Sequence, residues 1–282
     1  MKEIIVLLTL LLSLNSTAND LNKLKTQKIG YDTSIEYLLD NINPAGTMKG
    51  TVVASPSKAD PNYFYHWVRD AALVMNTVFE AALKETNQVR KEKLFSVVYD
   101  YVERVKNNQF VSGFWNLGEP KYHVDGRAFT GPWGRPQHDG PGLRAITLIN
   151  FANHLLNEGN TDYVTNNLYN SVLPALSPIK QDLEYVARHW NKQGFDYWEE
   201  VMGLHFSTAM SHRKALIQGA QLARRLGDVY AAVHYERVAK DVEILINKFW
   251  SNQKGYIQAT LFQTRGVWKS QLDISVILGV HH

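Results

Sequence analysis

The sequence predicts an all-α protein in which paired helices form a ring, and two observations support this. Apolar residues recur every three or four positions through most of the 282 residues, which is the period of amphipathic helices. Some connections between these stripes are short, whereas those over residues 43–65, 111–138 and 193–207 are long and rich in Gly, Pro and aromatic residues. Helix pairs with every second connection elaborated indicate a helical toroid, whose long loops gather on one rim and line a funnel.

The apolar stripes predict about eight helices, most of them long. In chain order the clearest stripes cover residues 68–82, 94–105, 143–156, 179–190, 216–223 and 229–249. Two helix starts are marked: Ser177 precedes Pro178 as a capping residue, and Asp139 is expected to cap a helix with Pro141 in its first turn. Strand signals are weak, and residues 256–262 are the best candidate.

The first eighteen residues are expected to lie outside the fold. Lys2 precedes an apolar run over residues 4–14, and small side chains follow at residues 16–18, the pattern of a secretory signal peptide cleaved after Ala18. The alternative is a buried N-terminal helix. The run is too short to span a bilayer, and no later segment reaches a spanning length. We therefore expect residues 19–282 to be secreted or periplasmic, without a membrane span, as the N-terminal portion of one catalytic domain.

Composition excludes several classes of function. The formal net charge is +3 and no Lys/Arg tract occurs, so nothing favours a nucleic-acid partner. The absence of Cys excludes a disulfide framework, a thiolate metal site and a Cys nucleophile. The ten His show no metal-ligand spacing, and neither a phosphate-binding Gly loop nor a G-x-S-x-G elbow is present. We expect no metal or cofactor, and the sequence does not indicate the oligomeric state.

The sharpest feature is the run Trp198, Glu199 and Glu200, which lies between Gly194 and Gly203. An adjacent like charge and an apolar neighbour both raise the pKa of a carboxyl group, and a protonated carboxyl can donate a proton to a leaving oxygen. The alternative is a solvated pair of glutamates at a helix start. Sequence neighbours lie too close together to flank a glycosidic bond, where acid and base stand ~5–9.5 Å apart. If either is the acid, its partner lies elsewhere in the chain.

A second group opens the helix predicted after residue 67. Arg69 and Asp70 precede its apolar stripe and follow Tyr63 and Trp67. An Arg/Asp couple can hold sugar hydroxyls above an aromatic platform, and the alternative is a structural ion pair among core aromatics.

A third group lies in the longest loop. Trp133 and Arg135 flank Gly134 and precede Pro136, so an indole and a guanidinium occupy a fixed turn in which a core residue would be unusual.

Several long blocks resemble glucoamylase, glycoside hydrolase family 15, in the same order and over about residues 30–279. The blocks are GTVVASPS at 50–57, YFYHWVRD at 63–70, GEPK at 118–121, GPWGRPQ at 131–137, DGPGLR at 139–144 and FDYWEEV at 195–201.

The resemblance implies an (α/α)6 toroid of the six-hairpin glycosidase type, incomplete at the C-terminus. It implies hydrolysis of α-1,4-linked glucans such as starch or maltooligosaccharides from non-reducing ends, with inversion to β-glucose. Glu199 matches the general acid, and Arg69 and Asp70 match the residues that grip the terminal glucose. The further matching pocket positions are Tyr63, Trp67, Trp133, Arg135, Trp198 and Glu200.

Two departures from the family pattern stand out. Tyr197 replaces the usual Leu before Trp198, which would reshape one wall of the pocket. Residues 273–279 resemble a segment well before the end of the family's catalytic domain, so we expect the general base and a further substrate-binding Arg and Trp to fall after residue 282. We then expect the 282-residue chain not to turn over starch or maltose at glucoamylase rates, and a carbohydrate-binding remnant that lacks the general base is the alternative to a glycosidase.

Overall fold

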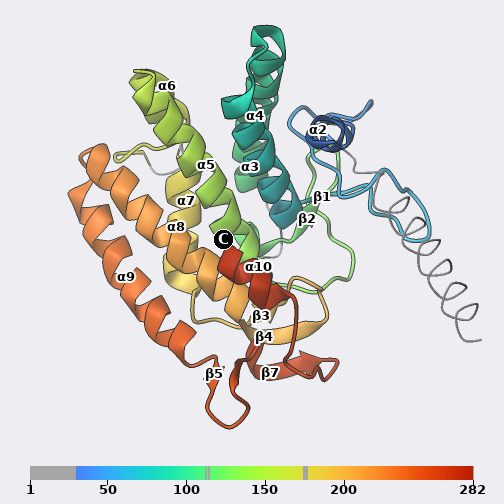
Figure 1. Cartoon of the computed structure of the whole chain (residues 1–282), viewed down its shortest axis with the longest axis vertical. Coiled ribbons are helices and arrows are strands. Elements are labelled where there is room, and N and C mark those ends of the chain that lie inside the picture. Colours follow the sequence, from blue (N-terminus) through green and yellow to red (C-terminus); the bar gives the residue numbers. More distant parts are fainter. Residues whose placement is uncertain (1–29, 112, 114, 174–176, 282) are drawn as a thin grey trace, which may run out of the picture. The chain divides into compact units, whose positions relative to one another are not determined.

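The computed structural model describes residues 30–111, 113, 115–173 and 177–281 (Figure 1). The predicted signal peptide lies outside these residues. The chain divides into two compact units, one ending at Leu39 and one running from Asp40 to His282. In the first unit the structure describes helix α2 (Tyr31–Leu39). Every predicted site residue belongs to the second unit, which the following paragraphs describe.

Four helices of the second unit form an inner row. They are α3 (Val68–Lys84), α5 (Asp139–Asn157), α8 (Phe206–Arg225) and α10 (Ser275–His281). Contacts run from α3 to α5, from α5 to α8 and from α8 to α10. Every residue from Asp139 to Ile149 is buried, because α5 is covered by neighbours on several sides.

The remaining helices of this unit pack against the inner row. They are α4 (Gln88–Phe110), α6 (Thr161–Asn167), α7 (Pro178–His189) and α9 (Val229–Asn247). Helix α4 contacts α3, α6 contacts α5, α7 contacts α5 and α8, and α9 contacts α8. Apart from α6 and α7, which follow each other and are both outer helices, the chain alternates between an inner and an outer helix, which is the pairing that the sequence predicts for a toroid.

The inner helices approach closely where their side chains are small. A Cβ atom on Gly140 would lie 2.8 Å from Cγ1 of Val68, so only glycine lets the first turn of α5 reach the start of α3. This close approach brings together the loops that precede the two helices.

A buried ion pair joins α5 to α7. Nε and Nη2 of Arg144 donate to the two carboxylate oxygens of Asp182 at 2.8 and 2.6 Å, and both side chains are almost fully buried. Burial raises the pKa of Asp182, although the Arg144 guanidinium opposes that shift. Each charge therefore depends on the other for its stability in the core.

One of the two predicted helix starts is confirmed, whereas for the other the position is confirmed, because α5 begins at Asp139 with Pro141 in its first turn, but the capping role of Asp139 is wrong. The Ser177 hydroxyl accepts a hydrogen bond from the backbone N–H of Lys180, and Pro178 occupies the first turn of α7. Helix α5 instead has His138 at its N-cap position, without a capping side-chain bond. The Asp139 side chain is turned inward and pairs with buried Arg69, because a buried guanidinium needs a counterion.

Short antiparallel strands brace the connections between the helices. They are β1 (His66–Trp67), β2 (Lys121–Tyr122), β3 (Gly194–Phe195), β4 (Val201–His205), β5 (Trp250–Ser251), β6 (Tyr256–Ile257) and β7 (Thr260–Gly266), and the 3-10 turn η1 (Asn116–Gly118) precedes β2. Strand β1 pairs with β2, β5 pairs with β6, and β3, β4 and β7 form a three-stranded sheet. Figure 1 shows this sheet at one end of the helices.

Two sequence-based expectations change here. Residues 193–207 are not a structureless loop, because they contain the β3–β4 hairpin. The strand expected over residues 256–262 is divided between β6 and β7, which belong to different sheets. Within the described ranges, no helix has the length and apolar character needed to span a membrane.

Candidate active site

Glu199 lies in a tight turn between two hairpin strands, over residues 196–200, which we call the site turn. Gly194 pairs with Gly203 and Phe195 with Met202, so the two glycines that bracket the run in the sequence face each other in the hairpin. Glu199 has φ 62°, in the left-handed region that non-glycine residues rarely adopt. Such strained backbone persists only where neighbouring contacts impose it.

Asp196 supplies contacts that impose this conformation. Its Oδ1 accepts hydrogen bonds from the backbone N–H groups of Glu200 at 2.7 Å and Val201 at 2.9 Å, and its carbonyl accepts one from the N–H of Glu199. An Asp side chain that bonds to nearby backbone amides in this way stabilises a turn. Contacts among residues of the site turn and its neighbour Val201 therefore hold this backbone conformation.

The Glu199 carboxylate is held through a single oxygen. Nε1 of Trp67 donates to Oε1 at 2.7 Å, and Nε2 of Gln137 donates to the same atom at 2.8 Å. Nη2 of Arg69 lies 3.9 Å from Oε1. Oε2 has no hydrogen-bond partner among the described residues. Residues from two separate segments, the β1–α3 junction and the loop before α5, thereby converge on one atom and leave the second oxygen available.

Arg69 is anchored by the residues around it. Its Nη1 donates to Oδ2 of Asp139 and to Oε1 of Gln137, both at 2.9 Å, and its Nε lies 3.5 Å from Oδ2 of Asp70. Burial disfavours the charge of Arg69, but Asp139 and Asp70 outweigh this and raise its pKa above the ordinary value. Gln137, which we did not single out from the sequence, links Arg69 to Glu199 through its two amide atoms.

Asp70 is the more accessible member of the Arg69–Asp70 couple. Its side chain is 37% exposed, compared with 13% for Arg69. Burial raises the pKa of Asp70, and the Arg69 charge opposes that shift. Oδ2 of Asp70 is buried beside Nε of Arg69 and makes no hydrogen bond with the residues described, so it is not the atom through which Asp70 would contact a ligand.

A lysine that we did not identify from the sequence lies inside a cage of aromatic rings. Lys121 pairs with Trp67 across the β1–β2 ladder, and its Nζ is 3.1 Å from the ring centroid of Trp133. The centroids of Phe129, Tyr65 and Trp67 lie 4.2 to 4.5 Å from the same atom. Such short distances to aromatic faces are typical of cation–π contacts.

Burial lowers the pKa of Lys121 to about 8, against the opposing charge of Glu199. A single lysine in a loop carries no signal of this environment, because the cage is formed by residues from two separate loops. The nearest sequence signal was its position in the block GEPK at 118–121.

The aromatic residues predicted at the site lie next to one another. The rings of Tyr63 and Trp67 have centroids 6.0 Å apart, and so do those of Trp67 and Trp133. Trp67 is buried, whereas Tyr63 is 45% and Trp133 is 40% exposed. This arrangement gives an apolar surface beside the Glu199 carboxylate, of the kind on which the apolar face of a sugar can rest.

Arg135 lies behind this surface. Its Nε donates to Oε2 of Glu119 at 2.7 Å, while Nη1 and Nη2 donate to the carbonyls of Gly131 and Phe129, also at 2.7 Å. Its side chain is only 8% exposed. These bonds close the loop that carries Trp133.

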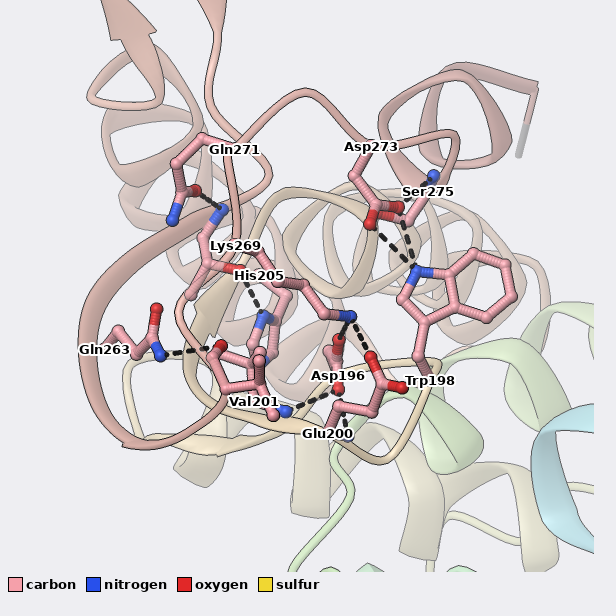
Figure 2. A network of polar contacts seen from close by, with 12 residues as sticks. Asp196, Trp198, Glu200, Val201, His205, Gln263, Lys269, Gln271, Asp273 and Ser275 are labelled. Atoms are coloured by element: carbon pink, nitrogen blue, oxygen red, sulfur yellow. Dashed lines mark hydrogen bonds and ion pairs between the residues drawn. The ribbon is translucent and has the colours of Figure 1, made fainter.

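Trp198 and Glu200 contact a different segment from Glu199. Nε1 of Trp198 donates to the carboxylate of Asp273 at 2.9 Å, and Oε2 of Glu200 lies 2.6 Å from Nζ of Lys269 (Figure 2). The structure thus brings Trp67, Arg69 and Glu199 close together, whereas the side chains of Trp198 and Glu200 are held from the segment that follows β7.

Residues 33–282 match the family described as Glycosyl hydrolases family 15. The chain belongs to glycosyl hydrolase family 15.

Among its family 15 relatives, the glucoamylase of Blastobotrys adeninivorans is 40% identical over 87% of this chain, and glucoamylase 1 of Rhizopus oryzae is 41% identical over 86%. The family 15 glucoamylase structure from Hypocrea jecorina superimposes with a TM-score of 0.77 at 35% identity over 86% of the chain. That of Hormoconis resinae gives a TM-score of 0.75. The chain spans about 40% of the length of these proteins.

These neighbours confirm the predicted fold class, because glucoamylases of this family have the (α/α)6 barrel. The helices described here correspond to a part of that barrel. The resemblance to glycoside hydrolase family 15 is likewise confirmed.

The residue at which this family 15 chain departs from the usual pattern is buried. Tyr197 is 7% exposed and packs with Ala72, Leu143 and Leu73, and the Arg69 guanidinium lies 5.5 Å from the centroid of its ring. The ring of Tyr197 therefore makes a cation–π contact with the Arg69 guanidinium. The part of the chain that the structure covers holds no cluster of three His, Asp or Glu side chains placed to bind a metal ion.

Proposed function

We propose that this chain is the acid-bearing part of a glucoamylase-type glycosidase, which releases glucose from the non-reducing ends of α-1,4-glucans such as starch and maltodextrin. Its membership of glycosyl hydrolase family 15 supports the proposal, as do relatives named glucoamylase at about 40% identity. The chain spans about 40% of those relatives, so the activity of the whole protein is a proposal here.

The assignment of Glu199 as the general acid depends on one observation. Two donors and the nearby Arg69 gather on its Oε1, and its Oε2 has no hydrogen-bond partner among the described residues. A carboxyl group fixed through one oxygen keeps a defined orientation, and its second oxygen can carry the proton. This division between an anchoring and a reacting oxygen is what proton donation to a leaving group requires.

The reaction is hydrolysis with inversion. The proton on Glu199 passes to the glycosidic oxygen as the bond from that oxygen to the anomeric carbon breaks. A water molecule attacks the anomeric carbon from the opposite face and loses a proton to a general base, which gives β-glucose. We assign that base to none of the described residues.

The neighbouring residues bind the sugar in this proposal. Asp70 accepts a hydroxyl through the exposed part of its carboxylate, and the neighbouring Arg69 favours the charged form of Asp70. Trp133 and Tyr63 offer the apolar surface.

The other residues complete the pocket. Glu200 accepts a hydroxyl through Oε1. Trp198 forms part of the wall, and Arg135 acts as a positioning residue for the loop of Trp133.

Two matched substitutions test the acid. In a chain completed with the remainder of the family 15 catalytic domain, Glu199→Gln keeps the shape and removes the proton, so glucose release from maltoheptaose should fall by about 10²–10⁴-fold. Binding of maltose, followed by tryptophan fluorescence, should stay nearly unchanged. Glu200→Gln should weaken binding as well as rate. Equal effects of the two substitutions on both quantities would contradict the assignment, and binding without any glucose release by the wild type would favour the binding remnant.

We also propose that the protein is secreted or periplasmic after cleavage following Ala18. The support is the sequence pattern alone, since these residues lie outside the described part. N-terminal sequencing of the protein from culture medium should begin at Asn19, and an intact Met1 there would exclude cleavage.

A further inference from the structure

The site turn is braced by a segment that lies about 70 residues further along the chain. Strand β4 leaves the turn at Val201, which pairs with Gly266 at the end of β7. Residues 266–275, which we call the bracing segment, then run past the turn to the start of α10. Figure 2 shows side chains of this segment directed at Asp196, Trp198 and Glu200. Glu199 therefore lies between Trp198 and Glu200, whose side chains both contact the bracing segment.

Lys269 is the first point of contact. Its Nζ lies 2.6 Å from Oε2 of Glu200 and donates to Oδ2 of Asp196 at 3.1 Å. Burial lowers the pKa of Lys269, but the two carboxylates outweigh this and raise it above the ordinary value. Because Oδ1 of Asp196 already holds the backbone of the turn, Lys269 links that backbone to the Glu200 side chain.

Lys269 also decides which atom of Glu200 is available. Its ammonium occupies Oε2, whereas Oε1 has no hydrogen-bond partner in the part of the chain that the structure covers. Glu200 thus shows the same pattern as Glu199, with one anchored and one available oxygen. A long Glu side chain without such an anchor would sample several rotamers, at a cost in entropy when it orders on a ligand.

Asp273 is the second point of contact. Both of its oxygens accept from Nε1 of Trp198, at 2.9 and 3.1 Å, and Oδ1 also accepts from the backbone N–H of Ser275. Burial raises the pKa of Asp273, but the hydrogen bonds from Ser275 and Trp198 outweigh it, so its pKa lies below the ordinary value. Asp273 therefore fixes the plane of an indole that is 42% exposed.

Gly266 is the third point of contact, and it shows how closely the bracing segment approaches. Its φ of 97° lies in the left-handed region, and a Cβ atom at this position would overlap the carbonyl oxygen of Glu200. The backbone of the bracing segment therefore packs directly against the site turn at Gly266, while Lys269 and Asp273 supply the polar contacts.

We propose that Lys269 and Asp273 are positioning residues for substrate binding: Lys269 orients Glu200 so that its free oxygen receives a sugar hydroxyl, and Asp273 fixes the Trp198 indole as a wall of the pocket. The inference rests on the proposed function for its ligand. An exposed surface ion pair contributes little, but here two side chains contact three of the five residues of the site turn.

The experiment compares disruptive with conservative variants of the full chain. Lys269→Met and Asp273→Ala remove the contacts, while Lys269→Arg and Asp273→Asn keep a donor and an acceptor. Lys254→Met is the matched control, because Lys254 lies in the β5–β6 hairpin and contacts Gln258 instead of the site turn. The readouts are the Kd of maltose, the KM and kcat for maltoheptaose, the melting temperature and the Trp198 indole N–H resonance, assigned by its loss in Trp198→Phe.

Lys269→Met should raise the Kd and KM about 10-fold, since small displacements of binding groups carry costs of this order, with kcat and melting temperature changed less. Lys269→Arg should recover most of the affinity. Asp273→Ala should move the Trp198 resonance, and Asp273→Asn should keep it near the wild-type position. If Lys269→Met does not fold, Lys269→Gln replaces it under the same criteria.

The outcomes separate this inference from the proposed function. A wild type that neither binds maltose nor releases glucose refutes the proposed function and with it the ligand-binding role. If the wild type binds maltose, unchanged Kd and KM in Lys269→Met overturn the role of Lys269. An unmoved Trp198 resonance in Asp273→Ala overturns the role of Asp273 whether or not the wild type binds. An equal loss in Lys254→Met would likewise overturn the inference, because the effect would not depend on the site turn.

Discussion

Breaking the buried pair between Arg144 and Asp182 should destabilise the inner row of helices that carries the site. The substitution is Arg144→Met, which keeps the length of the side chain and removes its charge. Asp182 then stays in the core, with a side chain fully buried, and it loses the two hydrogen bonds of 2.6 and 2.8 Å. An uncompensated buried charge of this kind costs about 3–5 kcal/mol, out of a total stability of ~5–15 kcal/mol.

That loss corresponds to a fall in melting temperature of roughly 6–20 °C, at ~2–4 °C per kcal/mol for a chain of this size. The double variant Arg144→Met/Asp182→Leu should recover most of it, because apolar replacement of the whole pair is often neutral. Arg224→Met is the control. It removes one partner of an exposed pair with Glu236 and should leave the melting temperature unchanged.

The effect should also depend on pH with a definite sign. Burial raises the folded-state pKa of Asp182, and loss of Arg144 raises it further. A carboxyl with a raised folded pKa contributes stability below its unfolded pKa and loses it as pH rises through the folded pKa. The deficit of Arg144→Met should therefore be smaller at pH 4 than at pH 7, as measured by circular dichroism melts. A deficit below about 1 kcal/mol at pH 7, or a double variant no more stable than the single one, would refute the reasoning.

Two further predictions concern the residues around Glu199. Burial lowers the pKa of Lys121 from 10.5 to about 8, so the folded chain binds fewer protons there than the unfolded chain between these values. The difference in melting temperature between the wild type and Lys121→Met should therefore shift in favour of the wild type from pH 7 to pH 9.5. A difference that does not change with pH would contradict the lowered pKa of Lys121. Gly266→Ala should destabilise by about 1–3 kcal/mol, since it adds overlap with Glu200 to the strain of positive φ. Gly255→Ala is the control, because Gly255 has φ 71° with open space around it, so this variant carries the strain alone and should lose less stability. Equal melting temperatures of the two variants would show that the overlap at residue 266 is relieved without a cost in stability.

The sequence by itself predicted the helices of this protein well. The stripe over residues 68–82 became α3, and that over residues 229–249 became α9 with its last two residues beyond the helix. Ser177 capped α7 as expected. These features depend on contacts within a few residues, so they are present in any stretch of sequence with the right period and caps.

The run at residues 198–200 drew attention through its carboxylates, yet its hairpin was not predicted. Strands β3 and β4 contain only two and five residues, and β4 also pairs with β7, which begins at Thr260. Pairing over such a separation leaves no local periodicity to detect. The roles implied by the resemblance to family 15 located the candidate acid, but they did not include Gln137 or Lys121.

Only the tertiary structure decided how the polar groups pair. Asp139 has the sequence position of a helix cap, but the buried Arg69 draws its carboxylate into the core. Lys121 reads as a loop lysine, and four rings from two separate loops surround its ammonium. Glu200 is fixed by Lys269 from the bracing segment. A charged side chain in the interior is stable only when an oppositely charged or polar group lies beside it. The separation of such partners along the chain has no fixed period, so it leaves no pattern in the sequence. The sequence therefore determined the helices, and the tertiary structure determined the site.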